Sequence, residues 1–152
     1  MYRIAVLTSS ETQEAFYIEQ LSRFCFERGL FPKMDCYRGQ ELFFDVARVN
    51  APTCTVIALP GVEGLNAVEH LRTLFPETRI IWCSDLDFSL HAFRLRVDYF
   101  LLEPITEEAF QQGTFYMVRW GKKRLPYSGR ITTNITMRRI IDEKEKKIYS
   151  VI

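Results

Sequence analysis

Four short, nearly uninterrupted apolar runs and one more polar segment alternate, over residues 4–102 of this chain, with stretches of helical periodicity. Short apolar runs of this kind are typical of strands buried on both faces of a parallel sheet. The clearest is Cys54–Leu59, which Pro60 and Gly61 end. The predicted strands are Ile4–Leu7, Leu30–Tyr37 (an edge or near-edge strand), Cys54–Leu59, Ile80–Cys83 and Tyr99–Leu102.

The segments between these strands predict helices. Ser10 followed by Gln13 is a capping-box pattern that starts the first helix, and Gly29 is a good C-terminal stop. The second helix is expected over 39–50, and the later helices over 64–75, 88–97 and 106–120. The residues of the second helix expected to face the core are Leu42, Phe43, Val46 and Val49.

Alternation of strands and helices predicts right-handed β-α-β units and therefore an α/β domain. We expect a doubly wound, five-stranded parallel sheet in the flavodoxin-like order 2-1-3-4-5, formed by residues 1–120. Residues 121–152 differ, because they open with a basic linker at Lys122-Lys123-Arg124. The β-branched residues of Arg130–Ile141 and the run Lys147–Ile152 then predict a C-terminal β-hairpin extension.

Composition narrows the classes of function. The chain has 152 residues, with 20 Lys and Arg against 19 Asp and Glu, a formal net charge of +1. A balance this even gives no sign of a nucleic-acid or membrane surface. The cysteines are far apart in the sequence and lie in apolar surroundings, so we expect buried, reduced thiols, no metal site, no cofactor and a cytoplasmic location. They are Cys25, Cys36, Cys54 and Cys83. No signal peptide or membrane-spanning run is expected.

The segment Tyr99–Thr106 resembles the Tyr-Leu-x-Lys-Pro signature that closes the receiver domain of bacterial response regulators. Four further segments resemble that family in the same order. Arg3–Leu7 is similar to its first strand and Cys36–Leu42 to its passage from strand to helix. Leu59–Leu65 is similar to its Met-Pro-Gly-Met-x-Gly loop, and Ile80–Ser84 to its fourth strand. The resemblance covers residues 1–120 and implies a receiver domain of two-component, phosphorelay signal transduction. It also implies a cis peptide bond before Pro104.

Receiver chemistry, as the resemblance implies it, is aspartyl phosphorylation. It requires an aspartate nucleophile at the end of the third strand, two carboxylates after the first strand that hold Mg²⁺, and a lysine at the end of the fifth strand. Here the acidic pair is replaced by Thr8 and Ser9, the aspartate is absent, and the lysine is Glu103. The degenerate receiver-site positions are Thr8, Ser9, Leu59, Ser84, Glu103 and Pro104. We therefore predict a pseudo-receiver with no phosphoacceptor, no catalytic residue and no enzyme activity.

A receiver without phosphorylation chemistry is expected to act through protein-protein contact, in signal transduction or transcription regulation. We expect a homodimer and a regulatory partner protein. The resemblance implies pairing through the fourth helix, fifth strand and fifth helix. The aromatic residues expected on that interaction surface are Phe93, Tyr99, Phe110, Tyr116 and Trp120. The β-rich tail is an alternative dimerisation arm.

Other functions stay open. The crevice at the carboxyl ends of the strands is a suitable place for a small-ligand sensor, and the loss of its acidic pair favours an anion or a neutral ligand. A metal site built from Glu11, Glu63, Asp85 and Glu103 is a further alternative there. The third is a remnant of a LytTR-type DNA-binding transcription regulator, because Lys147–Ile152 resembles an early strand of that domain. DNA binding by this chain alone is not supported, since the sequence stops at that point.

Overall fold

The predicted strands form one parallel sheet in the computed structural model, which describes residues 2–118 and 132–133. The strands are β1 (Arg3–Thr8), β2 (Lys33–Tyr37), β3 (Cys54–Ala58), β4 (Arg79–Ser84) and β5 (Tyr99–Leu102). Their order, β2-β1-β3-β4-β5, confirms the flavodoxin-like prediction. β1 lies between its two neighbours, with Leu7 beside Tyr37 on one side and Ile57 on the other.

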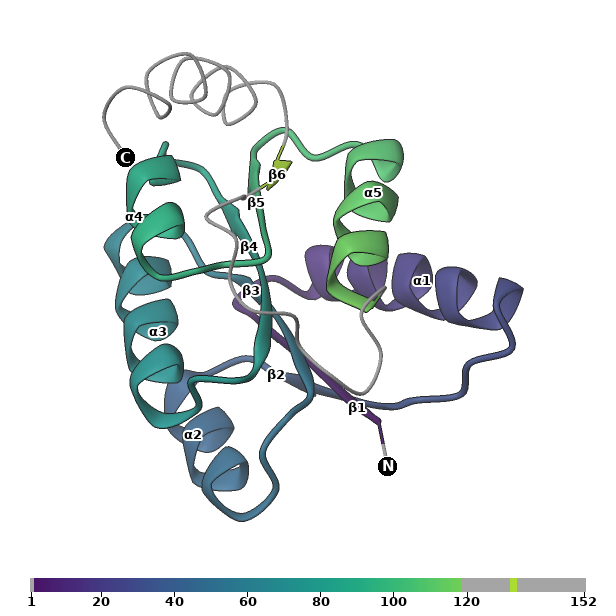
Figure 1. Cartoon of the computed structure of the whole chain (residues 1–152), viewed down its shortest axis with the longest axis horizontal. Coiled ribbons are helices and arrows are strands. Elements are labelled where there is room, and N and C mark those ends of the chain that lie inside the picture. The colour runs from purple at the N-terminus through teal and green to yellow at the C-terminus, as the bar shows by residue number, and fades with distance from the viewer. Residues whose placement is uncertain (1, 119–131, 134–152) are drawn as a thin grey trace, which may run out of the picture.

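Helices cover both faces of the sheet (Figure 1). α1 and α5 lie on one face, and α2, α3 and α4 lie on the other. Their bounds are α1 (Glu11–Glu27), α2 (Gln40–Val49), α3 (Gly61–Leu74), α4 (Ser89–Arg94) and α5 (Glu107–Val118). None of the helices within the described ranges is long and apolar enough to span a membrane.

A sixth, two-residue strand extends the sheet beyond β5. β6 (Thr132–Thr133) pairs in parallel with Tyr99 and Phe100. The β-branched residues around position 132 predicted a strand but not the sheet that it joins, because a hairpin strand and an added edge strand have the same residue pattern. The predicted hairpin otherwise lies outside the described residues.

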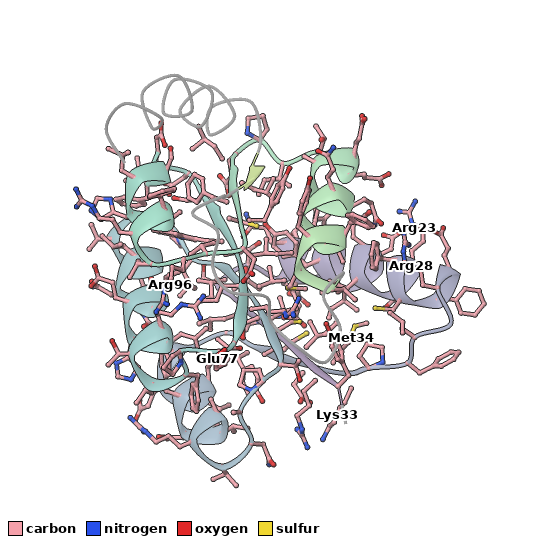
Figure 2. The ribbon with its side chains drawn as sticks, viewed as in Figure 1. Arg23, Arg28, Lys33, Met34, Glu77 and Arg96 are labelled. Carbon is pink, nitrogen blue, oxygen red and sulfur yellow. The ribbon has the colours of Figure 1, made fainter. Side chains whose placement is uncertain are left out.

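The opposite edge of the described sheet is β2. It pairs with β1 alone among the described strands. Figure 2 marks two of its residues, Lys33 and Met34. The strand begins three residues later than predicted, at Lys33, and its residues are exposed or half-buried.

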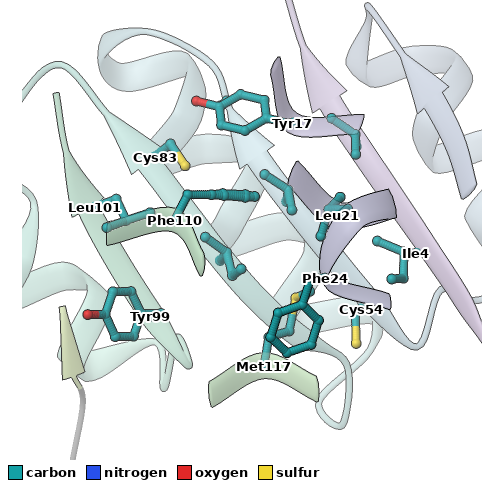
Figure 3. Close-up of a cluster of buried hydrophobic side chains, with 14 of the residues drawn as sticks. Ile4, Tyr17, Leu21, Phe24, Cys54, Cys83, Tyr99, Leu101, Phe110 and Met117 are labelled. Atoms are coloured by element: carbon teal, nitrogen blue, oxygen red, sulfur yellow. The ribbon is translucent and has the colours of Figure 1, made fainter. Parts of the chain in front are cut away.

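Two hydrophobic cores hold the layers together. The core under α1 and α5 includes Ile4, Leu21 and Phe110, with other members drawn in Figure 3. The core on the other face includes Leu7 and Trp82. Successive residues of a strand point to opposite faces, so each buried strand supplies both cores, which explains its continuous apolar sequence.

Helix α2 differs from the prediction in the residues that it buries. Phe43, Phe44 and Ala47 are buried, whereas Leu42 is 60% exposed and Val49 is 80% exposed. The prediction that Leu42 and Val49 face the core is therefore wrong, and Val46 is only half-buried. The sequence of this helix has two apolar stripes, and the stripe with two phenylalanine rings removes more apolar surface from water.

A buried arginine fixes the turn before β5. The guanidinium of Arg72, in α3, donates to the carbonyl oxygens of Leu95 at 2.9 Å and Arg96 at 3.0 Å. It also donates to those of Pro76 at 2.8 Å and Thr78 at 2.7 Å. Arg96 has a φ of 54°, a conformation that costs free energy in a non-glycine residue. Arg72 thus stabilises the strained turn at Leu95 and Arg96, which directly precedes β5.

Three of the four cysteines match the predicted burial. Cys25, Cys54 and Cys83 are buried and Cys36 is exposed, and all four are free thiols. The exposure of Cys36 corrects the prediction, because β2 is an edge strand whose side chains are incompletely covered. Burial raises the pKa of the Cys54 thiol to about 12. That thiol therefore stays protonated at neutral pH.

Candidate functional site

The carboxyl ends of β1, β3, β4 and β5 meet at one edge of the sheet, where open α/β sheets bind ligands. Thr8 ends β1, Leu59 follows β3, Ser84 ends β4 and Glu103 follows β5. The structure therefore brings the predicted site positions to one crevice.

A hydrogen-bond network joins the two sides of this crevice. Ser10 caps α1 by accepting from the backbone N–H of Gln13 at 3.3 Å, as the capping-box pattern predicted. The Thr8 hydroxyl accepts from the Ser10 N–H at 3.2 Å and donates to Gln13 Oε1 at 3.2 Å. Gln13 Nε2 then donates to Glu103 Oε1 at 3.1 Å. Thr8 thereby orients the Gln13 amide so that its N–H groups face the Glu103 carboxylate.

Glu103 takes the position at which the resemblance expects a lysine. Its side chain is exposed, and its backbone N–H donates to the Ser84 carbonyl at 2.8 Å. The peptide bond between Glu103 and Pro104 is cis, as predicted. The fold thus keeps the backbone of this segment, while the side chain brings a negative charge in place of a positive one.

The position after β3 is apolar. Leu59 is 1% exposed and packs in the core that contains Trp82. Its carbonyl oxygen lies so close to Gly64 that a Cβ on Gly64 would stand 2.5 Å from it, so α3 approaches β3 more closely than any side chain would allow. A buried leucine side chain has no group that attacks phosphorus.

Ser84 and Asp85 are both engaged in loop contacts. Ser84 is buried, and its Oγ accepts from the Leu86 N–H at 3.0 Å. Asp85 Oδ1 accepts from the N–H of Gly61, the first residue of α3, at 2.8 Å. The negative charge of Asp85 is favourable at this helix N-terminus. Gly61 has a φ of +58°, a left-handed conformation that glycine adopts without strain.

The chain was predicted to start α3 at Gly64, but the helix begins at Gly61. The Pro60-Gly61 pair ends β3, as expected, yet it also forms the start of the helix. The contact between Asp85 and Gly61 was not predicted, because the sequence offered Asp85 only as a metal-ligand candidate.

The residues of the crevice do not fit Mg²⁺. Thr8 and Ser9 supply no carboxylate after β1, and Leu59 supplies none after β3. Among the described residues, no group of three or more His, Cys, Asp or Glu side chains is arranged to hold a metal ion. The alternative metal site at Glu11, Glu63, Asp85 and Glu103 is therefore wrong.

An open groove of about 660 Å³ lies beside the network. It runs between the start of α1 and the segment after β5. Its lining residues are Thr12, Gln13, Phe16, Tyr17, Asp85, Glu103, Pro104 and Ile105. Two carboxylates and no basic side chain line the groove, so its charge favours a neutral or cationic ligand over the anion considered from the sequence.

Cys83, next to Ser84, is not a reactive thiol. It is buried, and burial raises its pKa to about 12. The hydrogen bond with Tyr17 opposes this shift, and the charge of Glu103 adds to it. Burial also raises the pKa of Tyr17. Both groups are therefore protonated and neutral at physiological pH, so neither is an anionic nucleophile in the groove.

The predicted aromatic interaction surface is only partly exposed. Tyr99 and Phe110 are buried under α1 and α5, so they are not surface residues, which corrects the prediction. Gly113 makes room for Tyr99, since a Cβ on Gly113 would stand 2.9 Å from its ring. Phe93 and Tyr116 are half-buried. Trp120 lies outside the described residues.

Comparisons with known proteins identify the fold. No known protein family matches the sequence. No curated protein matches it either. Solved structures do match, among them response regulators and receiver domains.

The activated receiver domain of DrrB, a Thermotoga maritima OmpR/PhoB homolog, has a TM-score of 0.63 and 18% identity, over 78% of this chain and 98% of that one. A LuxR-family response regulator from Aurantimonas sp. has a TM-score of 0.69 and 17% identity, over 95% and 97%. An atypical orphan response regulator, described as having a phosphorylation-independent regulatory mechanism, has a TM-score of 0.62 and 12% identity, over 80% and 99%. The chain therefore has the receiver fold.

Proposed function

We propose that this chain is a pseudo-receiver: a signalling module of the receiver fold that works without phosphorylation, through protein-protein contact. The observation that carries this proposal is the pair of substitutions in the crevice. β3 and Leu59 after it, the segment where a receiver has its aspartate, carry no carboxylate, and Gln13 holds the Glu103 carboxylate where a receiver has its lysine.

Electrostatics support this proposal. Phosphoryl transfer to a receiver needs positive charge, from Mg²⁺ and lysine, to balance the phosphoryl oxygens. This crevice has Asp85 and Glu103 in its groove and no basic side chain in the lining. An arriving phosphoryl group would face two like charges, each of which opposes it by roughly 1 to 4 kcal/mol at 4 Å.

The internal hydrogen bonds give the crevice a fixed structure without a ligand. The network from Thr8 through Gln13 to Glu103 joins β1 and α1 to the end of β5. Asp85 joins the end of β4 to the start of α3. In this proposal, these contacts hold the loops that phosphorylation and Mg²⁺ would otherwise order. The similarity to an atypical orphan regulator supports this proposal by analogy.

The proposal also covers the role of the chain in the cell and its oligomeric state. We infer that it regulates signalling or transcription as a homodimer in the cytoplasm, and that it has no enzyme activity. The four free cysteine thiols support the cytoplasmic location, because a reducing compartment keeps thiols free. The LytTR-type alternative concerns a tail that lies almost entirely outside the described residues, and no described contact favours it.

Incubation with acetyl phosphate and Mg²⁺, followed by intact-mass measurement, tests the proposal. We expect no phosphoryl adduct on the wild-type chain, while a phosphorylatable receiver treated in parallel gains one. A stoichiometric, hydroxylamine-sensitive adduct on this chain would reveal an acyl phosphate and would refute the proposal.

A small-ligand sensor is the second candidate, because the groove beside Phe16 is large enough for a small molecule. Its carboxylates favour a cationic or neutral ligand. Native mass spectrometry of the purified chain would support this candidate if a bound small molecule disappears in a Phe16→Ala variant. The same ligand retained by that variant would exclude the groove as its site.

A further inference from the structure

The open edge of β2 offers backbone groups for pairing with another strand. The Lys33 N–H donates to the Tyr2 carbonyl at 3.0 Å, so Lys33 directs its backbone groups toward β1. Backbone groups alternate in direction along a strand, so Met34 and Cys36 direct theirs away from the sheet. Exposed sheet edges with such groups are templates for the addition of a strand.

An apolar groove lies next to this edge. It has a volume of about 470 Å³ and is formed by the second half of α1 and the segment leading into β2. Phe26 is 74% exposed and Phe31 is 83% exposed, and both line the groove together with Met34. Exposed aromatic side chains in a cluster are typical of a surface that another protein covers.

The charges on β2 favour a second copy of the same strand. Two copies of β2 related by a two-fold axis pair antiparallel, and each register puts one residue on the axis. With Met34 on the axis, Lys33 of each copy lies directly opposite Asp35 of the other. Opposite charges at facing positions stabilise a strand pair. With Asp35 on the axis, two aspartates would face each other, which is unfavourable.

The backbone fits the Met34-centred register as well. Met34 directs both backbone groups outward, so the two Met34 residues would exchange two hydrogen bonds across the axis. The Cys36 N–H of each copy would meet the Pro32 carbonyl of the other. Pro32 has no N–H, so the Cys36 carbonyl of each copy receives no hydrogen bond from the other strand, and the paired ladder ends at this position. A lysine on an edge strand usually discourages pairing with another strand. Only in the Met34-centred register does Asp35 of the other copy lie opposite Lys33 and balance its charge.

We propose that two copies of this chain associate through their β2 edges, antiparallel and centred on Met34, to form one sheet that continues through both. The two apolar grooves meet at the axis, because Met34 lines each of them. This inference deepens the proposed function by giving its homodimer a surface. It does not depend on the crevice, so its failure and a failure of the phosphorylation proposal are distinguishable.

Sedimentation equilibrium of the full chain tests the charges. Lys33→Glu and Asp35→Lys should each weaken dimerisation roughly tenfold, because each sets like charges opposite one another. An equimolar mixture of the two variants should recover the wild-type affinity, since every facing pair is then of opposite sign. Asp35 also lies 3.7 Å from Arg3 within the chain, so Arg3→Gln serves as a control that should leave dimerisation unchanged.

Cross-linking tests the register. Residues of a hydrogen-bonded antiparallel pair have Cα atoms about 5.5 Å apart, which suits a disulfide. Met34→Cys in a Cys36→Ser background should therefore give a cross-linked dimer under mild oxidation. Lys33→Cys in the same background should not, because the two copies of that position are roughly 7 to 8 Å apart.

Three results would overturn the proposal. The first is a wild-type chain that stays monomeric at millimolar concentration. The second is a dimer that neither charge variant weakens. The third is a dimer that Phe115→Ser dissociates while Lys33→Glu does not, which would move the contact to the exposed part of α5.

Discussion

The side chains of Glu103 and Asp85 are both held by uncharged hydrogen-bond donors, the amide of Gln13 and the N–H of Gly61. Both contacts are made within the protein. In the proposed function, the crevice therefore needs neither Mg²⁺ nor a phosphoryl group, although its carboxylates remain accessible from the groove.

Restoring one charge should not restore the chemistry. Glu103→Lys returns the positive side chain that the receiver signature has, but Leu59 still supplies no nucleophile. We expect no phosphoryl adduct from acetyl phosphate, and a change in unfolding free energy within about 0.5 kcal/mol, because Glu103 is exposed. Intact-mass measurement and urea unfolding check both. Glu103→Gln is the matched control, since it removes the charge and keeps the shape.

The buried thiols predict a loss of stability at alkaline pH. The pKa values of Cys54 and Cys83 are about 12 in the folded chain, against 9.0 for an unperturbed thiol. Between these values the unfolded chain releases protons that the folded chain retains, so stability falls as pH rises from about 9 to about 12. Tyr17, whose pKa is also raised, acts in the same direction above pH 10.

Urea unfolding at pH 8 and at pH 10.5 measures this effect. The midpoint should fall at the higher pH, and a Cys54→Ala/Cys83→Ala variant should lose less stability over the same interval than the wild-type chain. An equal loss in both proteins would show that other groups cause the alkaline sensitivity.

Among the elements, Arg72 in α3 joins the turns that precede β4 and β5. It is 7% exposed and donates to four backbone carbonyls in the turns before β4 and β5. Arg72→Met should destabilise the fold by about 3 kcal/mol or more, because it leaves several buried carbonyl groups without this donor. Chemical denaturation measures the change.

Arg48 is the matched control for Arg72. It pairs with Asp45 at 3.2 Å on the surface of α2, with side chains that are 54% and 63% exposed. Exposed ion pairs contribute little, so Arg48→Met should cost less than about 1 kcal/mol. Similar losses of unfolding free energy in the two variants would mean that the buried hydrogen bonds of Arg72 stabilise the fold no more than an exposed ion pair does.

For the whole molecule, the strands were predictable because each buried strand is marked by its own local run of apolar residues, and their order followed from the alternation with helices that is typical of doubly wound sheets. The contacts of the crevice were not. Gln13 and Glu103 are 90 positions apart, and Gly61 and Asp85 are 24 apart. No local pattern marks such pairs. Only the cap formed by Ser10 and Gln13, three residues apart, was visible in the sequence.

Burial was predicted less well than element order. Helical spacing identified apolar faces on α2 and α5, but it did not determine which face meets the sheet. Leu42 is exposed and Phe110 is buried for that reason. The receiver fold is therefore clear from both sequence and structure, while its contact surfaces are defined only by the packed molecule.

An NMR titration of the protein with Mg²⁺, and then with beryllofluoride as a phosphoryl mimic, measures whether the crevice binds a phosphoryl group. With Leu59 buried and Glu103 negative, we expect amide signals that do not move beyond the effect of added salt. Saturable shifts confined to Ser9, Gly61, Ser84 and Glu103 would show that the crevice still binds this group.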